Sequence, residues 1–270
     1  MATVNVQKYI GVFDSGIGGL SVLKELLHEL PNENFVYLGD TARVPYGTRS
    51  PEVIRQFALE DVKFLSQFPL KAVVIACNTV SAVALDDVRE AVDVPVFDVV
   101  SAGEFAVRGV ERFGLVGTRA TISSSAYSGA FWRKACPLLV PLVEEGILSG
   151  ELPRLAVENY LEDMPSLSHL VLGCTHYPLL ATVFDEVARE VVGEPVTLIN
   201  PGRVLALQLR EFLGNRASLR GDRFPESPER LYYVTDLTPR FEETAGLFLG
   251  RPIELRRCGC LDPATPFLYP

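Results

Sequence analysis

Short apolar segments alternate with amphipathic segments along this whole chain, and the alternation limits the folds that it can adopt. Residues 9–14, 35–39 and 72–76 have the length and apolar character of buried strands. Helical patterns follow at residues 20–30 and from Ser50 onward. Strands that alternate with helices form mainly parallel sheets, because each helix returns the chain to the start of the next strand. The sequence therefore predicts an α/β fold.

The second half of the chain repeats this rhythm. We expect strands at residues 114–117, 138–142, 170–173 and 196–199, and a helix near residues 123–134. So many strands exceed a comfortable single doubly wound sheet. We therefore predict two similar flavodoxin-like lobes with mainly parallel sheets, related by pseudo-symmetry, with the active site in the cleft between them.

Two cysteines occupy nearly the same local setting in the two halves. Cys77 follows the apolar run 73–76, Cys174 follows the run 170–173, and a helix start is expected after each. The carboxyl ends of parallel strands are where open α/β sheets bind their ligands. The first turn of a helix also lowers the pKa of a thiol placed there. Two such thiols, one in each half, are expected to face each other across one substrate.

A pair of facing thiols suits the inversion of a carbon centre without a cofactor. Inversion requires a base on one face of the carbon and an acid on the other. Cysteine has an ordinary pKa of about 8.5, so that thiol and thiolate are both accessible near neutral pH. The simpler interpretation of a cysteine is a small buried apolar residue, and we assign Cys136 to the core on that basis. The polar residues that flank Cys77 and Cys174 favour chemistry for these two.

Three further segments carry polar residues next to these strand ends. Asp14 and Ser15 begin a glycine-rich turn that lacks the third glycine of a dinucleotide fingerprint, and Asp14 has two equal interpretations, as a structural cap or as a functional group. The loop of residues 40–47 could close over a ligand, although an ordinary surface loop is the simpler interpretation. His176 is expected to hold or activate the thiol of Cys174, or to assist proton transfer.

Composition excludes several other classes of protein. The net charge of −9 without a Lys/Arg cluster argues against nucleic-acid binding. No apolar run reaches the roughly 20 residues of a membrane span, and the N-terminal residues lack a signal-peptide pattern, so we expect a cytoplasmic protein with no membrane partner. The Cys258-x-Cys260 pair has no second pair at zinc-finger spacing, and we expect no metal site. No lysine stands out as a Schiff-base candidate for pyridoxal phosphate.

Together, these blocks resemble the glutamate racemases of bacterial cell-wall synthesis. The resemblance covers essentially the whole chain and lies in GVFDSGIGG (11–19), GDTARVPYG (39–47), ACNT (76–79), PLLVPLVE (137–144), GCTHYP (173–178) and NPG (200–202). It implies that one lobe contains residues 1–98 and 207–270 and the other contains residues 99–206. It also implies a cofactor-independent interconversion of L- and D-glutamate that supplies D-glutamate for peptidoglycan, carried out by a homodimer.

The resemblance further implies roles for particular residues. Cys77 would act on the D-isomer and Cys174 on the L-isomer, assisted by Asp14 and His176 and with Glu144 as a further contributor. The substrate contacts that it implies are Asp14, Ser15, Pro45, Tyr46, Gly47, Asn78, Thr79, Thr121, Thr175 and His176.

Three alternatives remain open at this point. The first is a racemase for aspartate or another acidic amino acid, since one methylene is a small discrimination. The second is an amino-acid-binding module on the same fold that no longer turns over, although binding alone does not need both Cys77 and Cys174. The third is a redox protein, which would require the two thiols to approach within disulfide distance, about 6 Å between Cα atoms.

Overall fold

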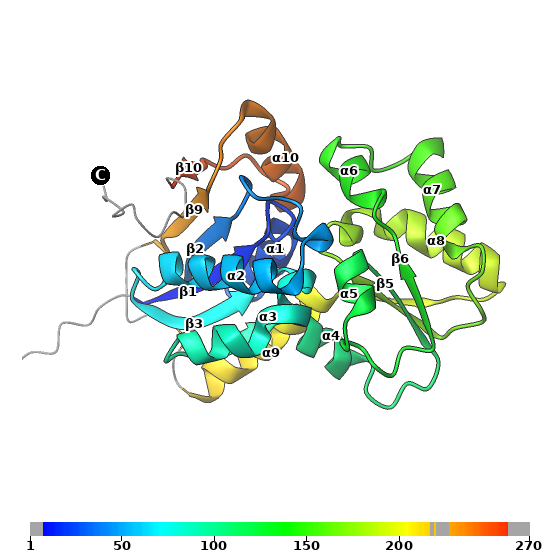
Figure 1. Ribbon diagram of the computed structural model, residues 1–270, viewed down its shortest axis with the longest axis horizontal. Helices are drawn as coiled ribbons and strands as arrows, with labels where there is room; N and C mark the ends of the chain where they lie inside the picture. Colours follow the sequence, from blue (N-terminus) through cyan, green and yellow to red (C-terminus); the bar gives the residue numbers. More distant parts are fainter. Residues whose placement is uncertain (1–7, 217–218, 220–226, 259–270) are drawn as a thin grey trace, which may run out of the picture.

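Two parallel sheets organise the computed structural model, which describes residues 8–216, 219 and 227–258. The first sheet has the spatial order β10 (Arg256–Arg257), β9 (Arg230–Val234), β2 (Asn34–Gly39), β1 (Tyr9–Asp14), β3 (Leu70–Ile75) and β4 (Val96–Asp98). The second has the order β6 (Trp132–Ala135), β5 (Phe113–Gly117), β7 (His169–Gly173) and β8 (Thr197–Ile199). Figure 1 shows the two sheets in separate lobes that lie side by side.

The two lobes share one strand order. Numbered within its own lobe, each sheet contains the order 2-1-3-4, as β2-β1-β3-β4 in the first and β6-β5-β7-β8 in the second. This is the flavodoxin-like order, and the first lobe extends it by β9 and β10 beyond β2. The predicted α/β fold with two similar lobes is thus confirmed.

Helices cover the sheets and join the lobes. Among the described residues, the α-helices are α1 (Leu20–Glu29), α2 (Pro51–Leu65), α3 (Asn78–Ala91), α4 (Val99–Ala106), α5 (Arg119–Ser123), α6 (Leu139–Glu144), α7 (Glu151–Leu161), α8 (Ala181–Val192), α9 (Pro201–Asn215) and α10 (Pro239–Leu249), and the 3₁₀ turns are η1 (Tyr46–Thr48) and η2 (Tyr177–Leu180). Helix α9 packs against both α1 and α4. One cluster of buried apolar side chains runs through both lobes, from Val12 and Leu23 to Val116 and Leu170.

Local signals explain the elements that the sequence predicts well. Every residue of β2 is buried, as expected for a central parallel strand covered on both faces. Ser50 caps α2, since its hydroxyl accepts a hydrogen bond from the Val53 N–H (3.5 Å), and Pro51 occupies the first helical position, where no N–H partner is needed.

Two predicted elements in the second lobe are wrong. The helix expected at 123–134 does not form. Helix α5 ends at Ser123, where the expected helix would begin, and the end of the expected segment forms β6, which pairs with β5. The strand expected at 138–142 is the helix α6. A short apolar run cannot be assigned by periodicity alone, and Pro141 is tolerated because the N–H groups of the first helical turn have no partner within the helix.

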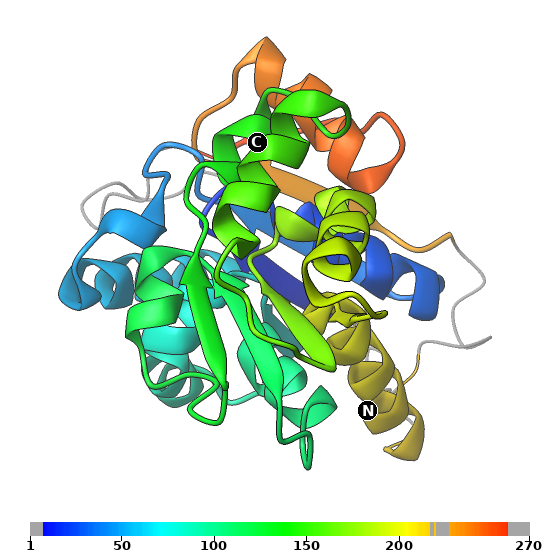
Figure 2. The same ribbon diagram turned by 90° about the vertical axis from the view of Figure 1, so that its right-hand side faces the viewer.

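The lobe boundaries at residues 98/99 and 206/207 remain our proposal. The strands of the first sheet lie within residues 9–98 and 230–257, and those of the second lie within residues 113–199. The second boundary falls inside α9. Helix α10, at the top of the first lobe in Figures 1 and 2, meets the end of α6 in the second lobe, where the Thr244 hydroxyl donates to the Glu144 carbonyl (3.4 Å).

Candidate active site

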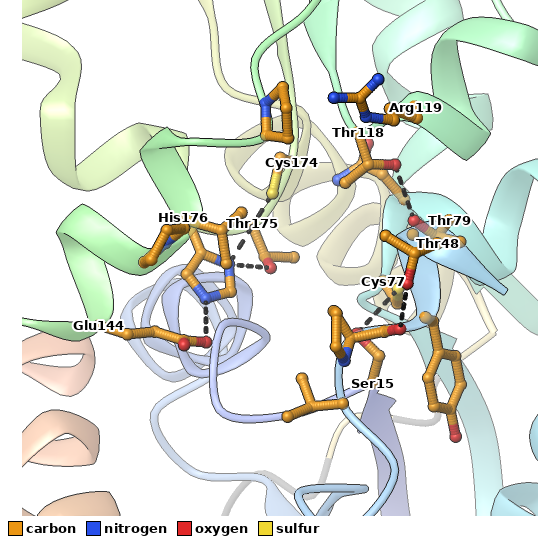
Figure 3. A pocket seen from close by; sticks show the side chains of 18 residues that line it. Ser15, Thr48, Cys77, Thr79, Thr118, Arg119, Glu144, Cys174, Thr175 and His176 are labelled. Carbon is orange, nitrogen blue, oxygen red and sulfur yellow. Dashed lines mark hydrogen bonds and ion pairs between the residues drawn. The ribbon is translucent and has the colours of Figure 1, made fainter. Parts of the chain in front are cut away.

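A cavity of about 320 Å³ lies between the lobes at the carboxyl ends of their strands. From the first lobe it is lined by Ser15 after β1, by residues 44–48 after β2 and by residues 77–79 after β3. The second lobe contributes residues that follow β5, β6 and β7 in the same way. This volume is typical of a small-molecule site. Figure 3 shows Cys174 and His176 on one side of the cavity and Cys77 and Ser15 on the other.

Cys77 is the N-cap residue of α3 and is 5% exposed. Its thiol donates to the Ser15 hydroxyl (3.4 Å). Burial, together with the negative charge of Asp14, raises the pKa of Cys77 to about 12. The expected lowering by the helix start is therefore wrong for this thiol: hydrogen bonds from Ser15 and the backbone of Val80 do favour the thiolate, but desolvation outweighs them. Cys77 is a thiol at neutral pH.

Cys174 has a different partner. Its sulfur lies 3.8 Å from His176 Nδ1, and the other ring nitrogen, Nε2, lies 3.0 Å from Glu144 Oε1. Burial alone would lower the pKa of His176, but the hydrogen bonds and charges of Cys174 and Glu144 raise it to about 10. The ring is therefore an imidazolium at neutral pH, and it donates from one nitrogen toward the sulfur and from the other to the carboxylate. The ring thus places a positive charge and an N–H donor beside the sulfur of Cys174.

The helix start expected directly after Cys174 is absent. The chain passes through η2 first, and α8 begins only at Ala181. Because the residue after His176 begins a 3₁₀ turn with proline at its second position, the α-helix and its dipole are moved away from the thiol. The charge beside Cys174 comes from a side chain instead.

Asp14 lies behind the wall of the cavity and does not line it. The carboxylate is 1% exposed and accepts a hydrogen bond from the Gly16 N–H (3.1 Å). Burial raises its pKa, against the opposing charge of His176. The turn that follows touches the second lobe: a Cβ on Gly18 would lie 2.4 Å from both His176 Cε1 and Thr175 Oγ1. Only glycine allows the lobes to approach this closely.

The loop after β2 contributes Pro45, Tyr46 and Gly47 to the lining of the cavity. The Tyr46 hydroxyl bonds to the carboxyl groups of Asp40 and Asp61. Desolvation and these two carboxyl groups raise the pKa of Tyr46 far above its ordinary value, so the phenol keeps its proton. Tyr46 therefore faces the cavity as a neutral ring whose hydroxyl is fully engaged within the first lobe.

A chain of hydroxyl groups crosses from one lobe to the other. Thr79 Oγ1 lies 2.9 Å from Thr118 Oγ1, which lies 3.0 Å from Thr121 Oγ1. Thr121 is fully buried and does not line the cavity, whereas Thr118 does. The sequence interpretation missed Thr118 and its neighbour Arg119, although both directly follow a predicted strand and thus carried the same positional signal as the two cysteines.

The remaining predicted residues Asn78, Glu144 and Thr175 line the cavity. No lysine is among the described residues that do so. The part of the chain that the structure describes contains no group of three or more His, Cys, Asp or Glu side chains that could hold a metal ion. Cys258 donates to the Val234 carbonyl (3.3 Å), and Cys260 lies outside the described residues. None of the described helices is long and apolar enough to cross a bilayer.

Comparisons with known proteins all point to one protein family. The Asp/Glu/hydantoin racemase family model matches residues 10–209. The glutamate racemase of Persephonella marina is 40% identical over 261 residues, covering 92% of this chain and 96% of that protein, and the glutamate racemase of Thermus thermophilus is 42% identical over 252 residues, covering 92% and 95%. The crystal structure of glutamate racemase from Francisella tularensis in complex with D-glutamate superposes with a TM-score of 0.86 at 37% identity, covering 95% of this chain and 98% of that one. This chain therefore belongs to the Asp/Glu/hydantoin racemase family.

Proposed function

We propose that this amino-acid racemase interconverts L- and D-glutamate by direct proton transfer at the α-carbon between Cys77 and Cys174. The observation that carries the proposal is that both thiols line one small cavity from opposite lobes. The relatives named glutamate racemase, and the Francisella structure with bound D-glutamate, support glutamate as the substrate.

The two thiols have different surroundings. His176, as an imidazolium, places a positive charge beside the sulfur of Cys174, whereas burial keeps Cys77 protonated. In one direction the Cys174 thiolate takes the α-proton and becomes a thiol. The Cys77 thiol then delivers its proton to the opposite face of the α-carbon and becomes a thiolate. The reverse reaction begins from that second state, so that each turnover exchanges the roles of the two sulfurs.

We assign the L-isomer to Cys174 and the D-isomer to Cys77. This assignment follows the family resemblance, which gives one face of the α-carbon to each thiol. Asp14 acts on Cys77 through its charge from behind the wall, and Glu144 acts on Cys174 through His176.

The hydrogen-bond donors around the cavity fit the carboxylates of a dicarboxylate substrate. Hydroxyl groups of Ser15, Thr79, Thr118 and Thr175 and the backbone N–H groups at the start of α3, which have no partner within the helix, can donate to carboxylate oxygens. Such donors also stabilise the negative charge that develops when the α-proton leaves. The α-carboxylate then carries much of that charge, which is why a thiolate can suffice as the base.

Proton NMR of L-glutamate with the purified, reduced protein in D₂O tests the proposal. We expect loss of the α-proton signal together with decay of the optical rotation, with no cofactor added and with a chelator present. A folded protein with reduced thiols that exchanges no α-proton of glutamate would contradict the proposal. The same assay with aspartate then separates a different acidic substrate from a module that binds without turnover.

The cellular role follows from the product. We propose that the D-glutamate supplies peptidoglycan synthesis in the cytoplasm and that the enzyme works as a homodimer. Growth of a bacterial D-glutamate auxotroph that expresses this chain tests the role, and sedimentation equilibrium tests the oligomeric state. Growth that still requires external D-glutamate, or a monomer at all concentrations, would contradict the respective statement.

A further inference from the structure

Two buried carboxyl groups contact the single hydroxyl of Tyr46. The side chains of Asp40 and Asp61 are both 0% exposed. The Tyr46 hydroxyl donates to Asp40 Oδ2, and its oxygen also lies 3.2 Å from Asp61 Oδ2. A phenol has only one proton to donate. Two acceptors cannot share it in two full hydrogen bonds, so the contact with Asp61 needs a proton from Asp61 itself.

The charges in this cluster point the same way. Arg43 Nε lies 2.5 Å from Asp40 Oδ2, Arg43 Nη2 lies 3.2 Å from Asp61 Oδ1, and a third nitrogen pairs with Glu60. One guanidinium therefore faces three carboxyl groups, and full ionisation would leave two uncompensated negative charges. Burial, together with the charge of Asp40, raises the pKa of Asp61 well above its ordinary value against the opposing effect of Arg43. The titratable or charged groups that act on Asp61 are Asp40, Arg43, Tyr46, Glu60 and, through its phenol, Tyr37.

The cluster connects the cavity loop to two distant elements. Asp61 lies in α2, whereas Asp40 and Tyr46 belong to the loop after β2. On the other side of the loop, the Thr235 hydroxyl donates to Asp40 Oδ1 (2.8 Å) and accepts from the Ala42 N–H (2.9 Å). Tyr46 is the member of this cluster that also lines the cavity. Its ring position, and that of the adjoining loop, is thus set by groups outside the cavity.

We propose that Asp61 is a positioning residue of the active site, which shares one proton with Asp40 through the Tyr46 hydroxyl and so holds residues 44–48 against the substrate. The bonds run in one direction, from the Asp61 carboxyl O–H to the Tyr46 oxygen and from the Tyr46 O–H to Asp40. Asp61 touches no substrate in this arrangement. The kinetic part of the proposal rests on the proposed racemase function, whereas the structural part does not.

Two substitutions of Asp61 distinguish this role from simple packing. Asp61→Asn is the permanently neutral analogue, because its amide donates to Tyr46 while its oxygen accepts from Arg43. We expect it to keep KM within about threefold of the wild type. Asp61→Leu has a similar size but no donor. Because Tyr46 then lacks this partner, we expect KM to rise about tenfold, with a smaller change in kcat. Asp87→Leu, in α3 with a partly exposed side chain paired to Arg55, is the matched control and should leave KM unchanged.

Hydrogen–deuterium exchange of the peptide that covers residues 40–49 supplies a readout that does not depend on activity. We expect faster exchange in Asp61→Leu and wild-type exchange in Asp61→Asn. Wild-type KM and exchange in Asp61→Leu would overturn the positioning role. An Asp61→Asn variant as impaired as Asp61→Leu would overturn the proposal that Asp61 carries a proton. If the wild type does not racemise glutamate, the function fails but the exchange data still decide the role of Asp61.

If Asp61→Leu does not fold, the wild type and Asp61→Asn decide the matter between them. On raising the pH, ionisation of Asp61 should accelerate exchange of the 40–49 peptide in the wild type relative to Asp61→Asn at the same pH. A constant ratio of the two exchange rates, across the pH range over which both proteins remain folded, would overturn the proposal that Asp61 shares a proton with Asp40.

Discussion

Replacing Glu144 with glutamine removes one negative charge from beside His176 and keeps the size and an oxygen acceptor. Glu144 Oε1 lies 3.0 Å from His176 Nε2. The pKa of His176 is raised from 6.5 to about 10, and this difference corresponds to about 5 kcal/mol in favour of the protonated ring. Cys174 and Glu144 together produce it against desolvation. Since the Glu144 side chain is 33% exposed, solvent screens its charge. We therefore attribute about 1 to 2 of the rise in the pKa of His176 to this charge.

The expected pKa of His176 in Glu144→Gln is therefore about 8 to 9. Histidine NMR is a direct assay, because the chain contains only three histidines. The matched control is Glu145→Gln, since that neighbouring carboxylate pairs with Arg240 and does not line the cavity. A pKa of His176 that stays at about 10 in Glu144→Gln, or that is already near 6.5 in the wild type, would refute the reasoning.

The same charge has a signature in stability. A group whose pKa is higher in the folded protein than in the unfolded chain stabilises the fold fully below the unfolded value, and this contribution is lost as pH rises through the folded value. For His176 the window runs from 6.5 to about 10. We expect Glu144→Gln to be less stable than the wild type by about 1 to 3 kcal/mol at pH 6. The difference should vanish near pH 10, and urea unfolding at both pH values checks this.

Three further predictions concern the rest of the site. Cys77→Ser and Cys174→Ser should each lower kcat at least about 100-fold in both directions, because a hydroxyl is a far weaker base; near-normal turnover of either variant would contradict the two-thiol mechanism. Thr118→Val should raise KM about fivefold through loss of the contact to Thr79. An unchanged KM would show that this contact makes no contribution to substrate binding. The stability of Asp61→Asn relative to the wild type should increase between pH 5 and pH 8, because the wild-type carboxyl keeps its proton only in the folded state; parallel urea-unfolding curves of free energy against pH would contradict this.

Much of the site was predictable because its position depends on local patterns. A thiol directly after an apolar run lies at a strand end, and parallel strands present their carboxyl ends at one edge. Cys77 and Cys174 both line one cavity, in the positions that this rule gives them. Thr118 could have been included by the same rule, since it follows β5 in the way that the cysteines follow β3 and β7.

Other features could not be derived from local patterns. The segment 138–142 is too short for periodicity to distinguish strand from helix, and it forms α6. Asp14 adjoins Ser15 in sequence but lies behind the wall that Ser15 lines. The pKa of Cys77 is raised although the thiol is at a helix start, because the degree of burial depends on how the whole lobe packs.

The sequence by itself determined the α/β class, the two similar lobes and the pair of thiols, because strand and helix periods and strand-end positions are encoded in short stretches of chain. Only the tertiary structure decided the protonation states and the anchoring of the cavity loop. Cys174 and Glu144, the latter 32 residues away, keep His176 protonated, and the loop is held by Asp61 and by Thr235, 195 residues from Asp40. Electrostatic and hydrogen-bond energies depend on distance in space and on burial, and neither can be obtained from separation along the chain.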